Sequence, residues 1–340
     1  MRPMPDEQPT SEHAEVRAQL FDMLVGFMRT QALSVIAKLG VADVLTSTPM
    51  DVSEIARRVS AHEPSLYRLL RFLATEGVFA EVEPRRFTET ALSNGLRTDA
   101  PVTARWLAIM LGSEQYRSWG DALHSFMTGE PAFDQVYGSG FFDYLAEHPD
   151  ASGTFDRAMA AGSQGRVADL LSYDWTGIER VADIGGGNGA ALGVVLASNP
   201  HLRGVLFDLP TVVVAADEVL RDAGVLDRCD IVGGDFFTDS LPPADVYVLS
   251  QILHDWNDER ASAILRNCRR TLADDGRLLL VEGIVPDGPE PDFGKLIDLH
   301  MLVLVGGKER TESEWRALLA QERFEFRQVT PDGLIEARPV

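Results

Sequence analysis

The chain has 340 residues, with 31 Lys and Arg against 52 Asp and Glu, so its formal net charge at pH 7 is −21. Hydrophobic residues make up 45% of the chain and charged residues 24%, which is typical of folded proteins and excludes a disordered chain. The excess of acidic residues disfavours nucleic acid and anionic membranes as partners, because both carry negative charge.

The sequence shows no signal for export, membrane insertion or metal binding. Residues 1–12 are polar and contain three prolines, and we expect them to form a flexible tail. No run of 18 apolar residues is present, so we expect no membrane span and a cytoplasmic protein. Cys229 and Cys268 belong to no CxxC motif or Cys/His cluster, so neither a disulfide framework nor a zinc site is expected.

Residues 15–45 have a helical pattern with apolar side chains on nearly every face. The crowded positions are Leu20, Phe21, Met23, Leu24, Val25, Phe27 and Met28. A helix that is apolar all round must be buried, so we predict that this segment forms a homodimer interface. An ordinary core helix is the alternative.

Residues 51–90 have the pattern of a winged helix, and we assign residues 13–100 to a mainly helical, winged-helix dimerisation domain. Ser53 would cap a first helix, and Pro64 would open a second helix that runs to Thr75. Six arginines against seven acidic residues give 51–90 a net charge of −1. Because DNA-binding domains present a basic face, a ligand-sensing DNA-binding regulator is disfavoured.

Residues 101–170 are predicted to be helical and to carry the pocket for an aromatic acceptor. Eight aromatic side chains fall within 29 residues: Tyr116, Trp119, Phe126, Phe133, Tyr137, Phe141, Phe142 and Tyr144. This density suits the lining of a pocket for a flat, apolar ligand. Plain core packing explains most of these residues equally well.

Residues 171–340 alternate between short apolar strands and helices. The predicted strands are 181–184, 205–208, 230–232, 245–250 and 277–282, with helices at 188–197, 211–223 and 258–272. Repeated strand–helix units predict a doubly wound, mostly parallel, Rossmann-like α/β sheet. The ligand of such a sheet lies beyond the carboxyl ends of its strands.

A glycine-rich loop follows the first of these strands. Residues 183–190 fit both the G-x-G-x-x-[GA] dinucleotide pattern and the G-x-G-x-G pattern. Asp183 would repel a pyrophosphate but suits a cation, and Asp208 is placed to bind ribose hydroxyls. Asp235 and Phe236 can hold an adenine. These acids favour S-adenosylmethionine, which has a sulfonium and an ammonium and no phosphate, over NAD or FAD.

His254 and Glu282 follow or close neighbouring strands, so their side chains are expected to meet. A histidine held in one tautomer by a carboxylate is a general base. Methyl transfer to a phenol requires such a base, because a phenol of pKa ~10 is mostly neutral at pH 7. His300 is interpreted as part of the core or of the pocket wall.

The sequence resembles the S-adenosylmethionine-dependent O-methyltransferases of the plant caffeate and isoflavone type, and within them the bacterial natural-product branch. The resemblance covers about residues 15–338. It rests on five motifs: DIGGGNG at 183–189, FDLP at 207–210, GDFF at 234–237, LHDW at 253–256 and GKERT at 307–311.

The resemblance implies roles for individual residues. His254 would be the base, Glu282 its orienting partner and Glu309 a second acid, although Glu312 stays possible. Met159, Asp255 and Met301 would touch the acceptor, and no metal is implied. The cofactor residues would be Asp183, Gly185, Gly187, Asp208, Leu209, Asp235, Phe236 and Ser250.

These features predict an O-methyltransferase that acts on a phenolic hydroxyl of an aromatic natural product. A relative that binds S-adenosylmethionine for hydroxylation or decarboxylation is the alternative enzyme, and His254 argues against it.

Overall fold

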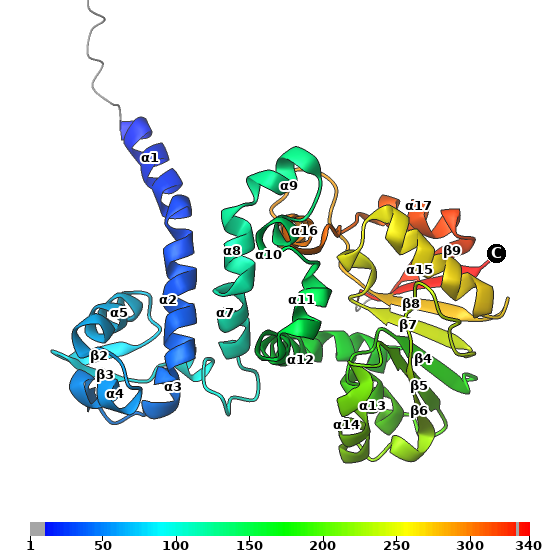
Figure 1. The fold of residues 1–340 in the computed structure, drawn as a ribbon, viewed down its shortest axis with the longest axis horizontal. Helices are drawn as coiled ribbons and strands as arrows, with labels where there is room; N and C mark the ends of the chain where they lie inside the picture. The colour runs from blue at the N-terminus through cyan, green and yellow to red at the C-terminus, as the bar shows by residue number, and fades with distance from the viewer. Residues whose placement is uncertain (1–10, 331–332) are drawn as a thin grey trace, which may run out of the picture. The chain divides into compact units, whose positions relative to one another are not determined.

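The computed structural model describes residues 11–330 and 333–340, which divide into two compact units (Figure 1). Unit 1 comprises Met1–Tyr116 and Thr154–Ala158, and unit 2 comprises Arg117–Gly153 and Met159–Val340. Apart from its last two residues, the tail expected at residues 1–12 lies outside the described part of the chain.

Unit 1 opens with three successive helices, α1 (Ser11–Leu24), α2 (Gly26–Leu39) and α3 (Val41–Val44). Gly40 separates α2 from α3 in the left-handed conformation, with φ of 68°, which glycine adopts without strain. The helical pattern predicted for residues 15–45 is therefore confirmed, in three segments.

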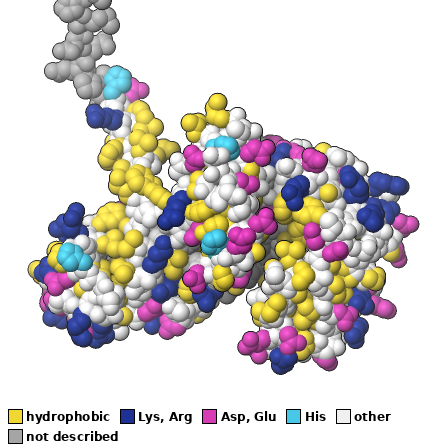
Figure 2. Space-filling view, viewed as in Figure 1, with side chains coloured by type: hydrophobic (Ala, Val, Ile, Leu, Met, Phe, Trp, Pro, Cys, Tyr) yellow, Lys and Arg dark blue, Asp and Glu magenta, His cyan; other side chains and the backbone are white. Residues whose placement is uncertain are grey.

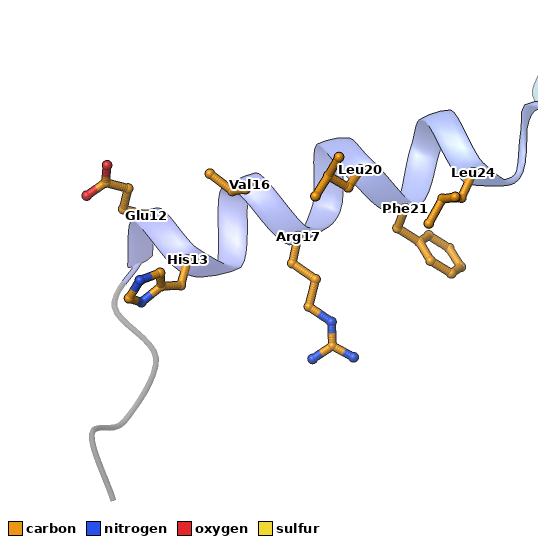
Figure 3. Close-up of a pocket in the computed structure, with 7 residues that line it drawn as sticks. All are labelled: Glu12, His13, Val16, Arg17, Leu20, Phe21 and Leu24. Carbon is orange, nitrogen blue, oxygen red and sulfur yellow. The ribbon is translucent and has the colours of Figure 1, made fainter. Parts of the chain in front are cut away.

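The apolar side chains of α1 are exposed, although a helix apolar all round was expected to be buried. Phe21 is 64% exposed and Met23 77%, and hydrophobic side chains run along the helix in Figure 2. A shallow groove on α1 is lined by side chains of this helix alone (Figure 3): Glu12, His13, Val16, Arg17, Leu20, Phe21 and Leu24. A groove on a single helix cannot enclose a small ligand, so this surface is suited to packing.

The mean hydropathy of the α1–α2 stretch was not predicted from the sequence. Although it contains no run of 18 apolar residues, Glu12–Leu39 is long and apolar enough on average to cross a membrane. A helix that packs against protein can have the same length and composition.

The winged helix of unit 1 is present. A small antiparallel sheet in the order β1 (Met50–Asp51), β3 (Arg86–Thr88), β2 (Ala80–Glu83) accompanies α4 (Val52–Arg58) and α5 (Glu63–Thr75). The predicted cap is wrong by two residues: Asp51, not Ser53, accepts the backbone N–H at the start of α4. Asp51 also accepts from the Ser53 hydroxyl, so Ser53 supports the cap.

The helices α6 (Ala91–Asn94) and α7 (Arg105–Leu111) complete most of unit 1. The end of α7 packs closely on α2, because a Cβ on Gly112 would lie 2.2 Å from the Cβ of Ser34, which is fully buried. Gln31 fixes the same contact by donating to the Gly112 carbonyl at 3.2 Å.

A helical stretch precedes the sheet of unit 2. It comprises part of α8 (Glu114–Gly120), α9 (Leu123–Thr128), α10 (Ala132–Tyr137), α11 (Phe141–Glu147) and most of α12 (Pro149–Ser172). Four of the predicted pocket aromatics pack on one another around buried Phe133, namely Phe133, Tyr137, Phe141 and Tyr144. For these four, core packing accounts for the aromatic density.

The predicted parallel sheet forms the body of unit 2. Its seven strands have the order β6-β5-β4-β7-β8-β10-β9, and the first five are parallel. Their bounds are β4 Arg180–Ile184, β5 Arg203–Asp208, β6 Cys229–Gly233, β7 Val246–Ser250 and β8 Arg277–Val281. Two further strands, β9 (Phe324–Val329) and β10 (Ile335–Pro339), were not predicted. β10 lies between β8 and β9 and is antiparallel to both.

Helices cover both faces of this sheet (Figure 1). Successive strand residues belong to opposite clusters, as Val181 and Ala182 do in β4. On one face α15 (Asp258–Thr271) and α17 (Glu312–Gln321) bury apolar side chains against the strands, and on the other α13 (Ala190–Ser198) and α14 (Ala216–Asp222) do so. Residues 213–215 form a short 3₁₀ turn, so the helix predicted at 211–223 starts later than expected.

The glycine at the α2–α7 contact provides a test of this packing. We expect Gly112→Ala to lower the free energy of unfolding by about 1–3 kcal/mol, because the new methyl group overpacks a closed contact. Gly120→Ala is the matched control, since nothing lies within 4 Å of its Cβ position and its φ is not positive. Urea unfolding of both variants measures the effect, and equal stabilities would contradict the packing argument.

Candidate active site

The loops that follow five parallel strands meet at one edge of the sheet. The Gly185 N–H donates to the Phe207 carbonyl at 2.7 Å, and the Gly234 N–H donates to the Asp208 carbonyl at 2.9 Å. The Gln251 N–H donates to the Val281 carbonyl at 3.0 Å. The sheet thus brings the predicted cofactor loops and the His254 segment to the same edge, where ligands of open α/β sheets bind.

The glycine loop between β4 and α13 is shaped by close approaches. Gly185, Gly187 and Gly189 all have positive φ, which favours glycine. A Cβ on Gly185 would lie 2.5 Å from the Ile252 side chain, and one on Gly186 would lie 2.5 Å from the Asp183 carboxyl. A side chain at position 185 would therefore push the loop away from the segment that carries His254.

Two acids flank this loop. Asp208 accepts from the backbone N–H groups of Gly187 at 2.8 Å and Leu209 at 2.6 Å. Asp183 is buried, and its Oδ1 has no hydrogen-bond partner among the described residues. Burial, together with the charge of Asp208, raises the pKa of Asp183 to about 7. A buried carboxyl oxygen without a donor fits a cationic ligand at this loop.

Aromatic side chains stand at the next loop. Asp235 accepts from the Phe237 N–H at 2.8 Å, which positions the Phe236–Phe237 pair. Trp256 packs edge-on against both phenylalanine rings, at 6.3 Å from Phe236 and 4.9 Å from Phe237. Trp256 was not selected from the sequence, although its place in the LHDW motif was the available signal. Ser250 ends β7, as predicted.

His254 and Glu309 form the central contact of the site. His254 lies in a 3₁₀ turn, Leu253–Asp255, and its Nδ1 is 2.7 Å from Glu309 Oε1. Both residues are buried. Because a carboxylate only accepts, Nδ1 carries a proton in both charge states of the ring, and Nε2 has a free lone pair when the imidazole is neutral. Glu312, the other acid considered from the sequence, is half exposed and pairs with Arg316.

Glu282 contacts the His254 turn in a different way from the one predicted. Its Oε1 accepts from the backbone N–H groups of Ile252 at 3.0 Å and Leu253 at 2.8 Å, and no hydrogen bond to His254 is found among the described residues. Its Oε2 is buried without a partner there. Burial raises the pKa of Glu282 to about 7. Glu282 therefore holds the turn through its backbone.

The GKERT motif brings Glu309 to the histidine. A Cβ on Gly307 would lie 2.1 Å from the His254 carbonyl oxygen, which instead accepts from the Lys308 N–H at 2.8 Å. Arg310 has no exposed side-chain surface and donates to the carbonyls of Leu253 and Trp256, each at 2.9 Å. Arg310 and Gly307 were not named as site residues, although both stand in the quoted motif.

The carboxylates around His254 change the pKa of its imidazole. Burial opposes the imidazolium form, but the carboxylates of Asp255, Glu309 and Glu282 outweigh it and raise the pKa of His254 above its usual value. Asp255 Oδ1 lies 3.5 Å from Nε2. Burial raises the pKa of Asp255 to about 6.

The residues expected to touch an acceptor lie on helices of unit 2. Met301 is on α16 (Gly294–Val305), which packs against the His254 turn, and Met159 is on α12. Asp298, also on α16, accepts from the Glu309 N–H at 2.9 Å, so this helix is fixed to the His254–Glu309 pair.

Comparison with known proteins identifies the family. A profile described as an O-methyltransferase domain matches residues 116–325, and one described as an O-methyltransferase dimerisation domain matches residues 21–99. The chain is 46% identical to the phenazine O-methyltransferase PhzM of Lysobacter antibioticus, over 94% of this chain and 96% of that protein. It is 33% identical to the aclacinomycin 10-hydroxylase RdmB of Streptomyces purpurascens, over 90% of this chain and 83% of the relative.

A solved structure supports the same family. The O-methyltransferase NcsB1 from neocarzinostatin biosynthesis, in complex with S-adenosylmethionine and 2-hydroxy-5-methyl naphthoic acid, matches with a TM-score of 0.81 at 34% identity, over 92% of this chain and 96% of that one. The chain therefore belongs to the family of S-adenosylmethionine-dependent O-methyltransferases with an N-terminal dimerisation domain.

The buried arginine gives a test of how the site is held. We expect Arg310→Met to lower the free energy of unfolding by about 3 kcal/mol or more, because it leaves buried carbonyls without donors at about 1–3 kcal/mol each. Urea denaturation measures this. Arg316→Met is the control, since Arg316 is half exposed, and its effect should stay below about 1 kcal/mol. If the two variants were equally stable, Arg310 would not hold the turn.

Proposed function

We propose that this chain methylates a phenolic hydroxyl of an aromatic natural product, with His254 as the general base. The observation that carries the proposal is the buried His254–Glu309 pair at the edge of the sheet where the cofactor loops converge. When bound, S-adenosylmethionine supplies an electrophilic methyl group on its sulfonium and leaves as a thioether.

The chain's own residues supply the proton acceptor. Glu309 fixes the Nδ1–H tautomer, so the Nε2 lone pair takes the hydroxyl proton as the acceptor oxygen becomes a nucleophile. The 3.5 Å between Nε2 and Asp255 Oδ1 is too long for a strong hydrogen bond, which leaves both atoms available to the acceptor. After transfer, the carboxylates that raise the pKa of His254 stabilise the imidazolium.

The cofactor would be held by Asp183, Gly185, Gly187, Asp208, Leu209, Asp235, Phe236 and Ser250. Of these, Asp208 has one carboxyl oxygen on the glycine loop, at the Gly187 N–H, and Phe236 with Trp256 provides aromatic surface for an adenine. Met159, Asp255 and Met301 would contact the acceptor.

The relatives suggest the kind of acceptor. PhzM is named for phenazine, and NcsB1 was solved with a hydroxynaphthoic acid, so a fused aromatic phenol is the acceptor class that we propose. The hydroxylase RdmB shows that the family also contains another reaction. A buried base with a fixed tautomer supports methyl transfer over hydroxylation in this chain.

We further propose that the chain works as a homodimer in the cytoplasm, without membrane or nucleic acid partners. The exposed apolar side chains of α1 lie in and next to the part matched by the dimerisation profile. Burying these side chains against a second copy would stabilise the dimer by about 25 cal/mol for each Å² of apolar surface that is removed from water. The same contact accounts for the membrane-like length and composition of Glu12–Leu39.

Replacing the proposed base should separate chemistry from binding. We expect His254→Asn to lower kcat by about 10²–10⁴, because the amide cannot take the proton. The affinity for S-adenosylmethionine, measured by calorimetry, should change by less than about threefold. Turnover should recover partly at high pH, where a phenol ionises unaided.

His201→Asn is the matched control for this variant. His201 lies ahead of β5 at the opposite edge of the sheet, where its Nε2 contacts the Trp175 carbonyl. Its kcat should match that of the unaltered protein. Near-normal turnover of His254→Asn at pH 7 would exclude His254 as the base.

The pH dependence tests the role of Glu309. Because the neutral imidazole is the active form, kcat/KM should rise with pH through an apparent pKa above 6.5. Glu309→Gln removes a negative charge that favours the imidazolium, so the rise should move to lower pH while the plateau falls. Glu312→Gln is the control and should leave the profile unchanged. A profile unmoved by Glu309→Gln would refute the proposed coupling.

The dimer can be tested by sedimentation at micromolar concentration. The double variant Leu20→Asp, Phe21→Asp should sediment as a monomer, because two charges on the exposed face of α1 would have to be buried. Val214→Asp, at another exposed apolar residue, in unit 2, should sediment like the unaltered protein. A monomeric unaltered protein would contradict the proposal.

A further inference from the structure

Helix α15 carries a buried asparagine that binds the loop after β6, residues 234–239. Asn267 is 5% exposed, and its side-chain nitrogen lies 2.8 Å from the carbonyl oxygens of both Phe236 and Asp239. Because carbonyl oxygens only accept, both N–H groups of the amide donate to the loop. No other donor to either carbonyl is found among the described residues. Asn267 therefore holds the loop at two points from a neighbouring helix.

The hydrogen bonds within the loop fix its internal shape. The Asp235 carboxylate accepts from the Phe237 N–H, and the Asp239 carboxylate accepts from the Asp235 N–H, each at 2.8 Å. The Asp239 N–H donates in turn to the Asp235 carbonyl at 2.8 Å. These bonds join the loop to itself, so they do not set its distance from the rest of the protein. The two bonds from Asn267 do.

The same loop reaches the edge of the sheet where the cofactor loops converge. Its first N–H, that of Gly234, donates to the Asp208 carbonyl at 2.9 Å. The Phe236 ring lies against the glycine loop, because its Cε1 is 3.6 Å from the position that a Cβ would take on Gly185. The place of this ring at the glycine loop therefore depends on how the backbone of Phe236 is held.

A second side chain of α15 contacts the same loop. Arg260 lies seven residues before Asn267, so the two side chains are on the same face of the helix. The guanidinium carbon of Arg260 is 4.5 Å from the ring centroid of Phe237 and 4.4 Å from that of Trp256, which are cation–π distances. This face of α15 thus contacts both the backbone and an aromatic side chain of the loop.

We propose that Asn267 is a positioning residue for cofactor binding. Its amide holds the Phe236 carbonyl so that the phenylalanine ring stays at the glycine loop and stacks on the adenine of S-adenosylmethionine. The proposal rests on the proposed contact between Phe236 and the adenine. Asn267 acts through Phe236, since its own two N–H groups are already bound by the loop. An asparagine that only stabilised the fold would have no selective effect on the adenine.

Two ligands separate the adenine from the rest of the cofactor. S-adenosylhomocysteine and S-ribosylhomocysteine share the sulfur, the ribose and the amino acid, but the second has no base. Competition calorimetry measures both affinities, and their ratio isolates the contribution of the adenine. We expect a ratio of about tenfold or more in the unaltered protein, from stacking on an aromatic ring. Neither ligand reacts, so the ratio does not depend on the proposed base or acceptor.

Substitutions of Asn267 should lower this ratio. Asn267→Leu has a similar size but no donor, and we expect a fall of about threefold to tenfold. Asn267→Asp keeps the shape, and its ratio should fall further as the pH rises, because ionisation removes its last donor and sets a carboxylate against two carbonyls. Asn199→Leu is the matched control: Asn199 donates to the Val195 carbonyl ahead of β5, at the opposite edge of the sheet, and its loss should leave the ratio unchanged.

A double-mutant cycle tests whether Asn267 acts through Phe236. Phe236→Ala should lower the ratio by itself, because it removes the stacking ring. The double variant Phe236→Ala, Asn267→Leu should then lose no more than Phe236→Ala alone.

The outcomes distinguish this proposal from the ones on which it rests. An unchanged ratio in Asn267→Leu, or losses that add in the double variant, would overturn the role of Asn267 and leave the adenine at Phe236. An unchanged ratio in Phe236→Ala would exclude the adenine from Phe236, and with it the role of Asn267. If Asn267→Leu does not fold, Asn267→Asp decides, since a ratio that follows the unaltered protein at every pH would overturn the proposal.

The proposed reaction is judged separately. Failure of methyl transfer with the expected ratios would count against the proposed phenolic acceptor or base, whereas the expected falls in the ratio would support the role of Asn267 in either case.

Discussion

The hydrogen bond between His254 and Glu309 joins residues 55 positions apart, and it exists only because their backbones meet first. Gly307 has no side chain to separate them, and the buried Arg310 binds the carbonyls on both sides of the histidine. Glu282 holds the same turn from β8. The orientation of the imidazole, and with it the nitrogen that faces Glu309, follows from this backbone contact.

Patterns along the chain predicted the parallel strands and the loops that follow them, because apolar runs and glycines are local signals. These patterns could not show which carboxylate forms a hydrogen bond with His254. Glu282 ends up beside the turn, as strand adjacency implies, but its oxygen is taken by two backbone N–H groups. Side-chain direction within a 3₁₀ turn is set by tertiary contacts. Local pattern also did not distinguish Asp51 from Ser53 as the cap of α4, and it did not predict β9 and β10.

The residues of the candidate site come from separate parts of the fold. The loops proposed to hold the cofactor follow β4, β5 and β6, whereas His254, the proposed base, and the residues that support it lie after β7, directly after β8 and beyond α16. A relative of the same family, RdmB, is named as a hydroxylase, so this architecture is also found in a protein named for another reaction.

The order of strands also has a consequence for synthesis on the ribosome. Glu282 directly follows β8, and one of the two neighbours of this strand is β10, which comes more than fifty residues later. Chains grow at about 5–20 residues per second, so the backbone groups along one side of β8 stay unpaired for seconds after the strand has emerged. During that time a half-built sheet offers an open edge to other nascent chains, and chaperone protection should matter most in that interval.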